Sequence, residues 1–175
     1  TDPEYNQLRK NDGRALEELF VDSEMAIKIS LLPKRLGVDA IIMFQDILTP
    51  LTPAGAGFRF SPGPILEKPV RTLSQVKALR AFDPEIHLQT VAQILKGLND
   101  ELKGELPVLG FAGSPMSLAF FLIAGSSPNQ KIKKVLEFVE EQPSIFRGLL
   151  DYLTEMTVDY INFQIVSGAH AVQGY

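Results

Sequence analysis

A run of apolar residues follows Gly37 and continues to Phe44, interrupted by a single charged side chain. A strand with one face in water would alternate polar and apolar residues, so this run predicts a strand that is buried on both faces. Asp46 follows where the strand should stop, because Pro50 and Pro53 cannot continue it. Functional groups gather at the carboxyl ends of parallel strands, which makes Asp46 a candidate functional acid. Its position leaves equally open that Asp46 only caps the following turn.

The spacing of apolar residues elsewhere predicts several helices. Between Ala15 and Arg35 we expect two helices in succession, with a break and an N-cap at Asp22 and Ser23. Further helices are expected at residues 73–79, from Asp83 to about Lys103, from Ser114 or Pro115 to 123, at 130–141 and at 143–167. His87, near the start of the second of these, is interpreted as a surface histidine.

Two more short apolar runs, at residues 106–111 and 169–173, predict further strands. Residues 49–64 are rich in Pro and Gly and predict a long loop, either a ligand-binding loop or a hairpin of residues 58–60 against 65–67. The order of strand, loop, helices, strand, helices and strand is typical of a parallel α/β fold. We expect a partial (β/α)8 TIM barrel, roughly the first half, with residues 1–175 forming a single incomplete domain, because no covering helix follows the last strand.

Composition narrows the possible partners. The 175 residues are 45% hydrophobic and 22% charged, which fits one globular domain with a real core. A net charge of −4 without a basic run argues against nucleic acid. The absence of cysteine excludes disulfides and thiolate metal sites, and we expect no metal. No apolar stretch has the length of a signal peptide core or a membrane span, so we expect a cytoplasmic protein without a membrane partner.

Three blocks of sequence carry a resemblance to one family. Residues 38–48 resemble the strand that presents the catalytic aspartate of uroporphyrinogen decarboxylases. Residues 107–118 are similar to that family's Gly-Phe-Ala-Gly-Ala-Pro turn, and residues 168–173 to its Gly-Ala-Gln-Ala-Leu-Gln strand. Three blocks in the right order are far more specific than one. The resemblance runs from Pro3 to Gln173, which is about the first half of a family member.

The resemblance implies a single-domain (β/α)8 barrel that acts as a homodimer. Such an enzyme removes carbon dioxide from the four acetate side chains of uroporphyrinogen to give coproporphyrinogen, in heme biosynthesis, without a cofactor. Asp46 matches the aspartate that holds the pyrrole N–H groups and stabilises the cationic pyrrole. Alternation along the strand then predicts that Ile42, Phe44 and Asp46 line one cavity. In the second block, the resemblance implies that Phe111 packs beside the substrate and that Gly113 allows its close approach.

Several positions depart from the family pattern. Phe121 stands in the substrate pocket where the family has a tyrosine, so the hydroxyl that supports the acid or the substrate is missing. Gln45 is larger than the small residue usual before the aspartate, and His170 replaces a glutamine. The family's arginine-rich motif would precede Pro3, and its later serine and histidine would follow Tyr175. The chain therefore contains the acid and part of the pocket.

Three functions remain open from the sequence. The first is a portion of a uroporphyrinogen decarboxylase, which the retention of Phe44 and Asp46 favours. The second is a corrinoid-linked methyltransferase of the same superfamily, whose zinc ligands would lie in the later half of the barrel. The third is a non-catalytic interaction protein, which Phe121 and the missing arginines favour.

Overall fold

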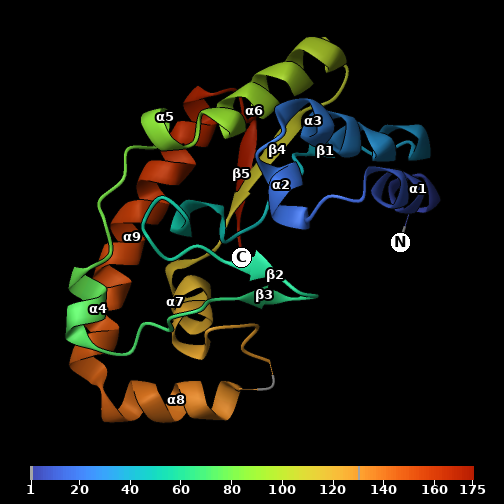
Figure 1. Cartoon of the computed structure of the whole chain (residues 1–175). Coiled ribbons are helices and arrows are strands. Elements are labelled where there is room, and N and C mark those ends of the chain that lie inside the picture. The colour runs from blue at the N-terminus through green and yellow to red at the C-terminus, as the bar shows by residue number, and fades with distance from the viewer. Residues whose placement is uncertain (1, 130) are drawn as a thin grey trace.

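A parallel sheet forms the centre of the protein in the computed structural model, which describes residues 2–129 and 131–175 (Figure 1). In these residues the sheet has the strand order β1 (Ile41–Ile42), β4 (Val108–Ala112) and β5 (Ala171–Gly174). Ile41 pairs with Val108, and Leu109 pairs with Ala171, both in parallel register. Parallel strands that lie side by side in chain order are the arrangement of a (β/α)8 barrel. The predicted fold class, a partial barrel, is confirmed.

Helices α3 (Ser23–Leu31), α6 (Gln89–Leu102) and α9 (Pro143–Val166) pack around this sheet (Figure 1). The remaining helices are α1 (Pro3–Asp12), α2 (Leu16–Phe20), α4 (Leu73–Lys77), α5 (Pro84–His87), α7 (Pro115–Ala124) and α8 (Ile132–Glu141), with the 3-10 turns η1 (Leu32–Leu36) and η2 (Thr49–Leu51). Between β1 and α4 the chain forms the antiparallel hairpin of β2 (Arg59–Phe60) and β3 (Pro64–Ile65). A hairpin within the long loop is therefore confirmed, although its second strand is Pro64–Ile65 rather than residues 65–67.

The core has two parts. One lies between the sheet and the helices α3, α6 and α9, where Ile41 and Val108 meet the apolar stripe of α6, including Leu95. The other packs the loop after β1 against α7, α8 and α9, with Leu51, Leu122 and Leu149 fully buried. Burial of apolar residues at helical spacing explains why α6 forms where the periodicity predicts it.

The prediction that the first strand is buried on both faces is wrong. Ile41 and Met43 are each 1% exposed, whereas Ile42 between them is 51% exposed. The helices cover one face of the sheet, and the described residues leave the face that carries Ile42 open. An apolar side chain on this open face therefore lines a cavity rather than a core.

Two helical predictions differ from the structure. The helix expected from Asp83 to Lys103 is interrupted at Leu88, whose φ of −122° and ψ of 33° are not helical and whose side chain is buried. Helix α1 was not predicted, because it has no apolar stripe and none of its residues is buried. Its end signals are nevertheless in the sequence, since Asp2 caps it, Pro3 begins it and Gly13 ends it with a φ of 72°. None of the described helices is long and apolar enough to cross a membrane.

Candidate active site

Asp46 lies in a tight turn just beyond β1. The Met43 N–H still donates to the Leu109 carbonyl of β4 (3.1 Å), but the next amide, that of Phe44, donates to the Ser30 hydroxyl (2.7 Å). Beyond this point the chain leaves the sheet. The Leu48 N–H donates to Asp46 Oδ1 (2.8 Å), and the Thr49 N–H donates to the Asp46 carbonyl (3.1 Å). Asp46 therefore does cap a turn, and it does so with one carboxylate oxygen.

The second carboxylate oxygen of Asp46 is available for a ligand. Within residues 2–129 and 131–175 no other hydrogen bond reaches this carboxylate. Partial burial raises the pKa of Asp46 above its ordinary value, and the bond from the Leu48 N–H opposes that rise. A carboxylate that is half removed from water, with an oxygen to spare, can bind an N–H donor or a cation more strongly than an exposed one.

An apolar cavity of about 620 Å³ lies beside this turn, on the open face of the sheet. Ile42 from β1, Phe44 from the segment just after it and Phe111 from β4 line it together. Tyr5 of α1 and Tyr175 also line it, with their rings 6.1 Å from those of Phe44 and Phe111, respectively. We call this space the apolar cavity. The structure thus brings together three of the residues that the sequence placed around a substrate.

Asp46 lines an adjoining cavity rather than the apolar cavity, and that Ile42, Phe44 and Asp46 contact one substrate stays a prediction. The carboxylate faces a second space of about 360 Å³, the acid cavity, whose lining also includes Glu17, Phe20, Phe58, Phe60 and His87. The physical reason is the early end of β1. Side chains alternate between two faces only while the backbone stays extended, and the turn after Phe44 rotates Asp46 out of that pattern.

Gln45 is common to the linings of both cavities. Its side chain is 9% exposed, donates to the Phe20 carbonyl (2.7 Å) and accepts from the Thr49 hydroxyl (3.0 Å). The large residue before the aspartate is thus held at both ends of its amide. A small residue could not make these contacts, and Gln45 forms part of the wall of both cavities.

Residues 1–174 match the family model described as "Uroporphyrinogen decarboxylase (URO-D)". The chain belongs to the uroporphyrinogen decarboxylase family. It is 37% identical over 172 residues to the uroporphyrinogen decarboxylase of Trichlorobacter lovleyi, covering 98% of this chain and 50% of the relative. It is 39% identical over 173 residues to that of Carboxydothermus hydrogenoformans, covering 97% of this chain and 49% of the relative.

The chain spans about half the length of the curated relatives it matches. Among solved structures, a methyltransferase from Methanosarcina mazei superposes with a TM-score of 0.68 at 16% sequence identity, covering 95% of this chain and 49% of that one. At this identity the likeness supports the fold alone. The match to a methyltransferase therefore does not favour the methyltransferase hypothesis over the decarboxylase family.

Phe111, which lies in the second family block, is held by a side chain of α9. The Gln164 side chain of α9 is fully buried, accepts from the Phe111 N–H (2.9 Å) and donates to the Phe111 carbonyl (3.0 Å). Gly113 lies close to protein atoms, since a Cβ there would be 2.6 Å from Leu118 Cδ2 and 3.4 Å from Ile47 Cβ. The space beside Gly113 is thus used by packing, and a role in approach to a substrate stays a prediction.

Phe121 lies outside the linings of both cavities. Its ring packs edge-on against Phe58, at a centroid distance of 6.3 Å, in the core under the loop. Phe58 in turn lines the acid cavity, so Phe121 supports that wall from behind. His170 accepts a hydrogen bond from the Val108 N–H at Nδ1 (3.1 Å), which a glutamine oxygen could accept as well.

Sequence reasoning missed several residues that line the cavities. Tyr5 could not be found because α1 was not predicted, although Asp2-Pro3-Glu4 is a recognisable helix start. Glu17 reaches the acid cavity from α2, and its position there has no local sequence signal. Within the described residues, no group of three or more His, Cys, Asp or Glu side chains is placed to hold a metal ion.

Proposed function

We propose that the whole protein to which this chain belongs is a uroporphyrinogen decarboxylase, a carboxy-lyase that converts uroporphyrinogen III to coproporphyrinogen III in heme biosynthesis. The observation that supports it most is Asp46, a half-buried acid with an available oxygen at the end of the first barrel strand of a chain from this family. The chain matches about half the length of the relative from Trichlorobacter lovleyi that carries this name.

The decarboxylation of an acetate side chain on a pyrrole needs an acid to stabilise a cation and apolar walls to hold the macrocycle. Protonation of a pyrrole ring carbon creates a cationic pyrrole that takes up the electron pair released when the acetate side chain loses carbon dioxide. A second protonation at the former acetate carbon, with loss of the ring proton, leaves a methyl group, so each step exchanges carbon dioxide for one proton. An ionised Asp46 stabilises the cation by accepting from the pyrrole N–H groups. The apolar walls formed by Ile42, Phe44 and Phe111 suit the macrocycle.

The mechanism requires Asp46 in its ionised form although burial favours the protonated one. The bond from the Leu48 N–H and the approaching pyrrole N–H groups both favour the carboxylate. The proposal assigns no cofactor, because the pyrrole itself serves as the electron sink. Arg14 pairs with Asp12 and Asp22 and is not assigned to the carboxylates of the substrate.

Replacement of Asp46 in the whole protein tests this function. Under anaerobic conditions with uroporphyrinogen, Asp46→Ala and Asp46→Asn should each lower kcat by about 10²- to 10³-fold, the usual effect of removing a group that stabilises a transition-state charge. Asp39→Asn is the matched control, because Asp39 is an exposed acid seven positions earlier in the chain and should leave kcat unchanged. Near-normal turnover of Asp46→Ala would remove Asp46 from the mechanism, and absence of coproporphyrinogen from the unmodified protein would refute the activity.

The proposal also covers the domain, the oligomeric state and the location of the whole protein. We propose that residues 1–175 contribute the first half of one barrel domain, and that the whole protein acts as a homodimer in the cytoplasm. Sedimentation velocity of the whole protein tests the dimer, since a monomer at micromolar concentration would contradict it.

A further inference from the structure

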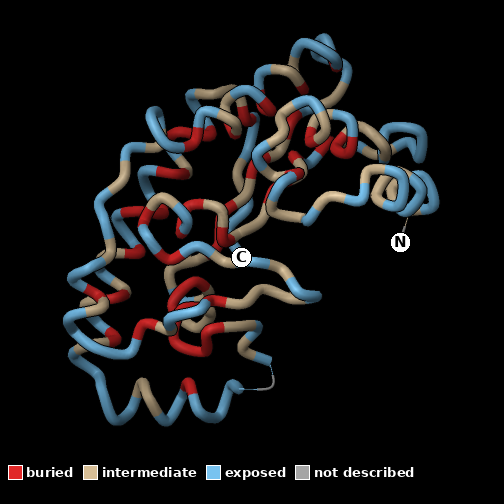
Figure 2. The backbone as a smooth tube through the Cα atoms, viewed as in Figure 1, coloured by how far each residue is buried: buried red, intermediate tan, exposed pale blue. Residues whose placement is uncertain are grey.

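Helix α1 contributes to the apolar cavity without being packed into the core. None of its residues is buried, as Figure 2 shows for the helix beside the N-terminus. Even so, its cap residue Asp2 and its first-turn residue Tyr5 line the apolar cavity, and the Tyr5 ring lies 6.1 Å from that of Phe44. Tyr5 and Leu8 are only half-buried, so the hydrophobic effect contributes little to holding α1, and polar contacts at its two ends supply further attachment.

The first attachment is at the start of the helix. Arg35, in the 3-10 turn η1, donates from Nε to Glu4 Oε2 (2.9 Å) and also pairs with the Asp2 carboxylate. Asp2 accepts from the Glu4 and Tyr5 N–H groups as the helix cap. One guanidinium therefore holds the cap of α1 to the turn that leads into β1.

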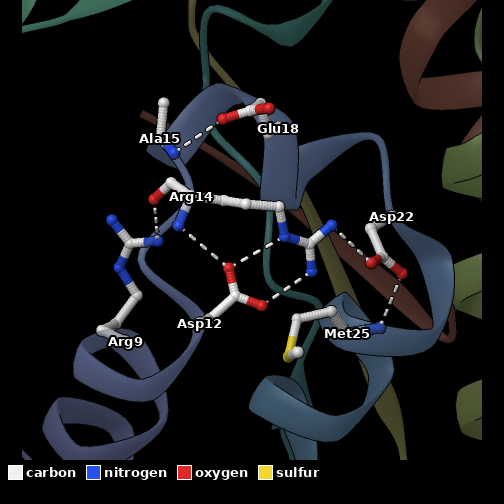
Figure 3. Close-up of polar contacts among 7 residues, drawn as sticks. All are labelled: Arg9, Asp12, Arg14, Ala15, Glu18, Asp22 and Met25. Carbon is white, nitrogen blue, oxygen red and sulfur yellow. Dashed lines mark hydrogen bonds and ion pairs between the residues drawn. The ribbon is translucent and has the colours of Figure 1, made fainter.

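The second attachment is at the end of the helix, around Arg14 (Figure 3). Arg14 donates from Nε and Nη2 to the two oxygens of Asp12, both at 2.8 Å, and from Nη1 to Asp22 Oδ2 (2.9 Å). Asp22 caps α3 by accepting from the Met25 N–H (3.0 Å), and Arg9 of α1 donates to the Arg14 carbonyl (3.0 Å). Hydrogen bonds from Arg14 lower the pKa of Asp12, which keeps this carboxylate charged near neutral pH.

We propose that Arg14 and Arg35 are positioning residues for the substrate: they hold α1 in place by charge, so that Tyr5 and Asp2 complete the wall of the apolar cavity. Naming the substrate as uroporphyrinogen rests on the proposed function, whereas the attachment of α1 does not. The fork of a guanidinium can bind a carboxylate with two bonds and still reach another, which an ammonium group cannot do.

Hydrogen exchange of the whole protein, measured without substrate, tests the attachment directly. Arg14→Gln and Arg35→Gln should each speed exchange of the α1 amides by about threefold and together by about tenfold, in keeping with the modest strength of exposed ion pairs. Arg14→Lys, which keeps the charge but loses the fork, should have an intermediate effect. Lys133→Gln is the control, because Lys133 pairs with Glu137 at 3.9 Å on the exposed side of α8, and it should leave α1 unchanged.

Salt offers a second measurement on the unmodified protein. At 1 M ionic strength the Debye length is about 3 Å, so exposed charges are largely screened. Raising the salt from about 0.1 M to about 1 M should speed α1 exchange in the unmodified protein and change little in the double variant. Unchanged α1 exchange in the double variant would overturn the proposal.

Kinetics then separate positioning of the substrate from general stability. The double variant should raise KM for uroporphyrinogen by about fivefold to tenfold and leave kcat within about twofold, because α1 shapes the cavity and does not touch Asp46. Faster exchange of α1 with an unchanged KM would refute the role in substrate binding. An unmodified protein that forms no product would refute the proposed function instead, and the exchange data would still decide whether Arg14 and Arg35 hold α1.

Discussion

Gly110 of β4 gives the sharpest quantitative prediction about this protein. A Cβ at this position would lie 2.2 Å from Gln164 Oε1, which is closer than a real Cβ approaches, and 3.2 Å from Gln164 Cδ, which is a tight contact. Gln164 is fully buried and makes both of its hydrogen bonds to the backbone of Phe111. Gly110→Ala must therefore displace an amide that has no room to move, and with it the anchor of a residue that lines the apolar cavity.

The cost of Gly110→Ala follows from these contacts. Two hydrogen bonds are lost at about 1 kcal/mol each, and overpacking in a dense core adds about 1–3 kcal/mol. The free energy of unfolding should fall by about 3–5 kcal/mol in total. With a urea m-value of about 2 kcal/mol per molar, the unfolding midpoint should drop by about 1.5 M or more.

Urea unfolding followed by circular dichroism measures this change, and Gly148→Ala is the matched control. Gly148 lies inside α9, and a Cβ added there would meet nothing within 4 Å, so alanine should raise stability by about 0.5–1 kcal/mol. The double variant Gly110→Ala with Gln164→Ala should be less destabilised than the sum of its single changes, because the amide that clashes is gone. A Gly110→Ala midpoint equal to that of the unmodified protein would refute the reasoning.

Two further predictions concern buried polar groups. Tyr160 is 1% exposed, and its hydroxyl has no hydrogen-bond partner among the described residues. Tyr160→Phe should therefore raise the free energy of unfolding by about 1 kcal/mol. Tyr152→Phe should lower it, because the Tyr152 hydroxyl donates to the Arg80 carbonyl (2.7 Å). A loss of stability in Tyr160→Phe would contradict the first expectation. Burial raises the pKa of Asp46 above its ordinary value of 3.8, so the folded state binds a proton at Asp46 more tightly than the unfolded state does. The free energy of unfolding should therefore fall as the pH rises from the unfolded-state pKa through the higher folded-state pKa. In urea unfolding, Asp46→Asn should therefore be more stable than the unmodified protein at neutral pH and about equal to it near pH 3. If Asp46→Asn is instead less stable at neutral pH, capping of the turn is the main role of Asp46.

Much of the fold could be predicted from the sequence because its signals are local. The apolar stripe of α6, the short runs that become β4 and β5, and the Pro- and Gly-rich loop are each recognisable within a few residues. The same holds for Asp46 at the end of its strand, since Pro50 soon follows it. Caps and periodicities depend on neighbours three or four positions away, and these neighbours are visible in a sequence.

The candidate site was decided by contacts between distant segments. Phe111 is held by Gln164, 53 positions away, and the cap of α1 is held by Arg35, 33 positions away. The end of β1 depends on Ser30 taking the amide of Phe44, which turns Asp46 into a different cavity from Ile42. The sequence by itself therefore determined the order of the elements and the acid that ends the first strand. Only the tertiary structure decided which cavity that acid faces, because burial and ion pairing depend on which remote side chains meet.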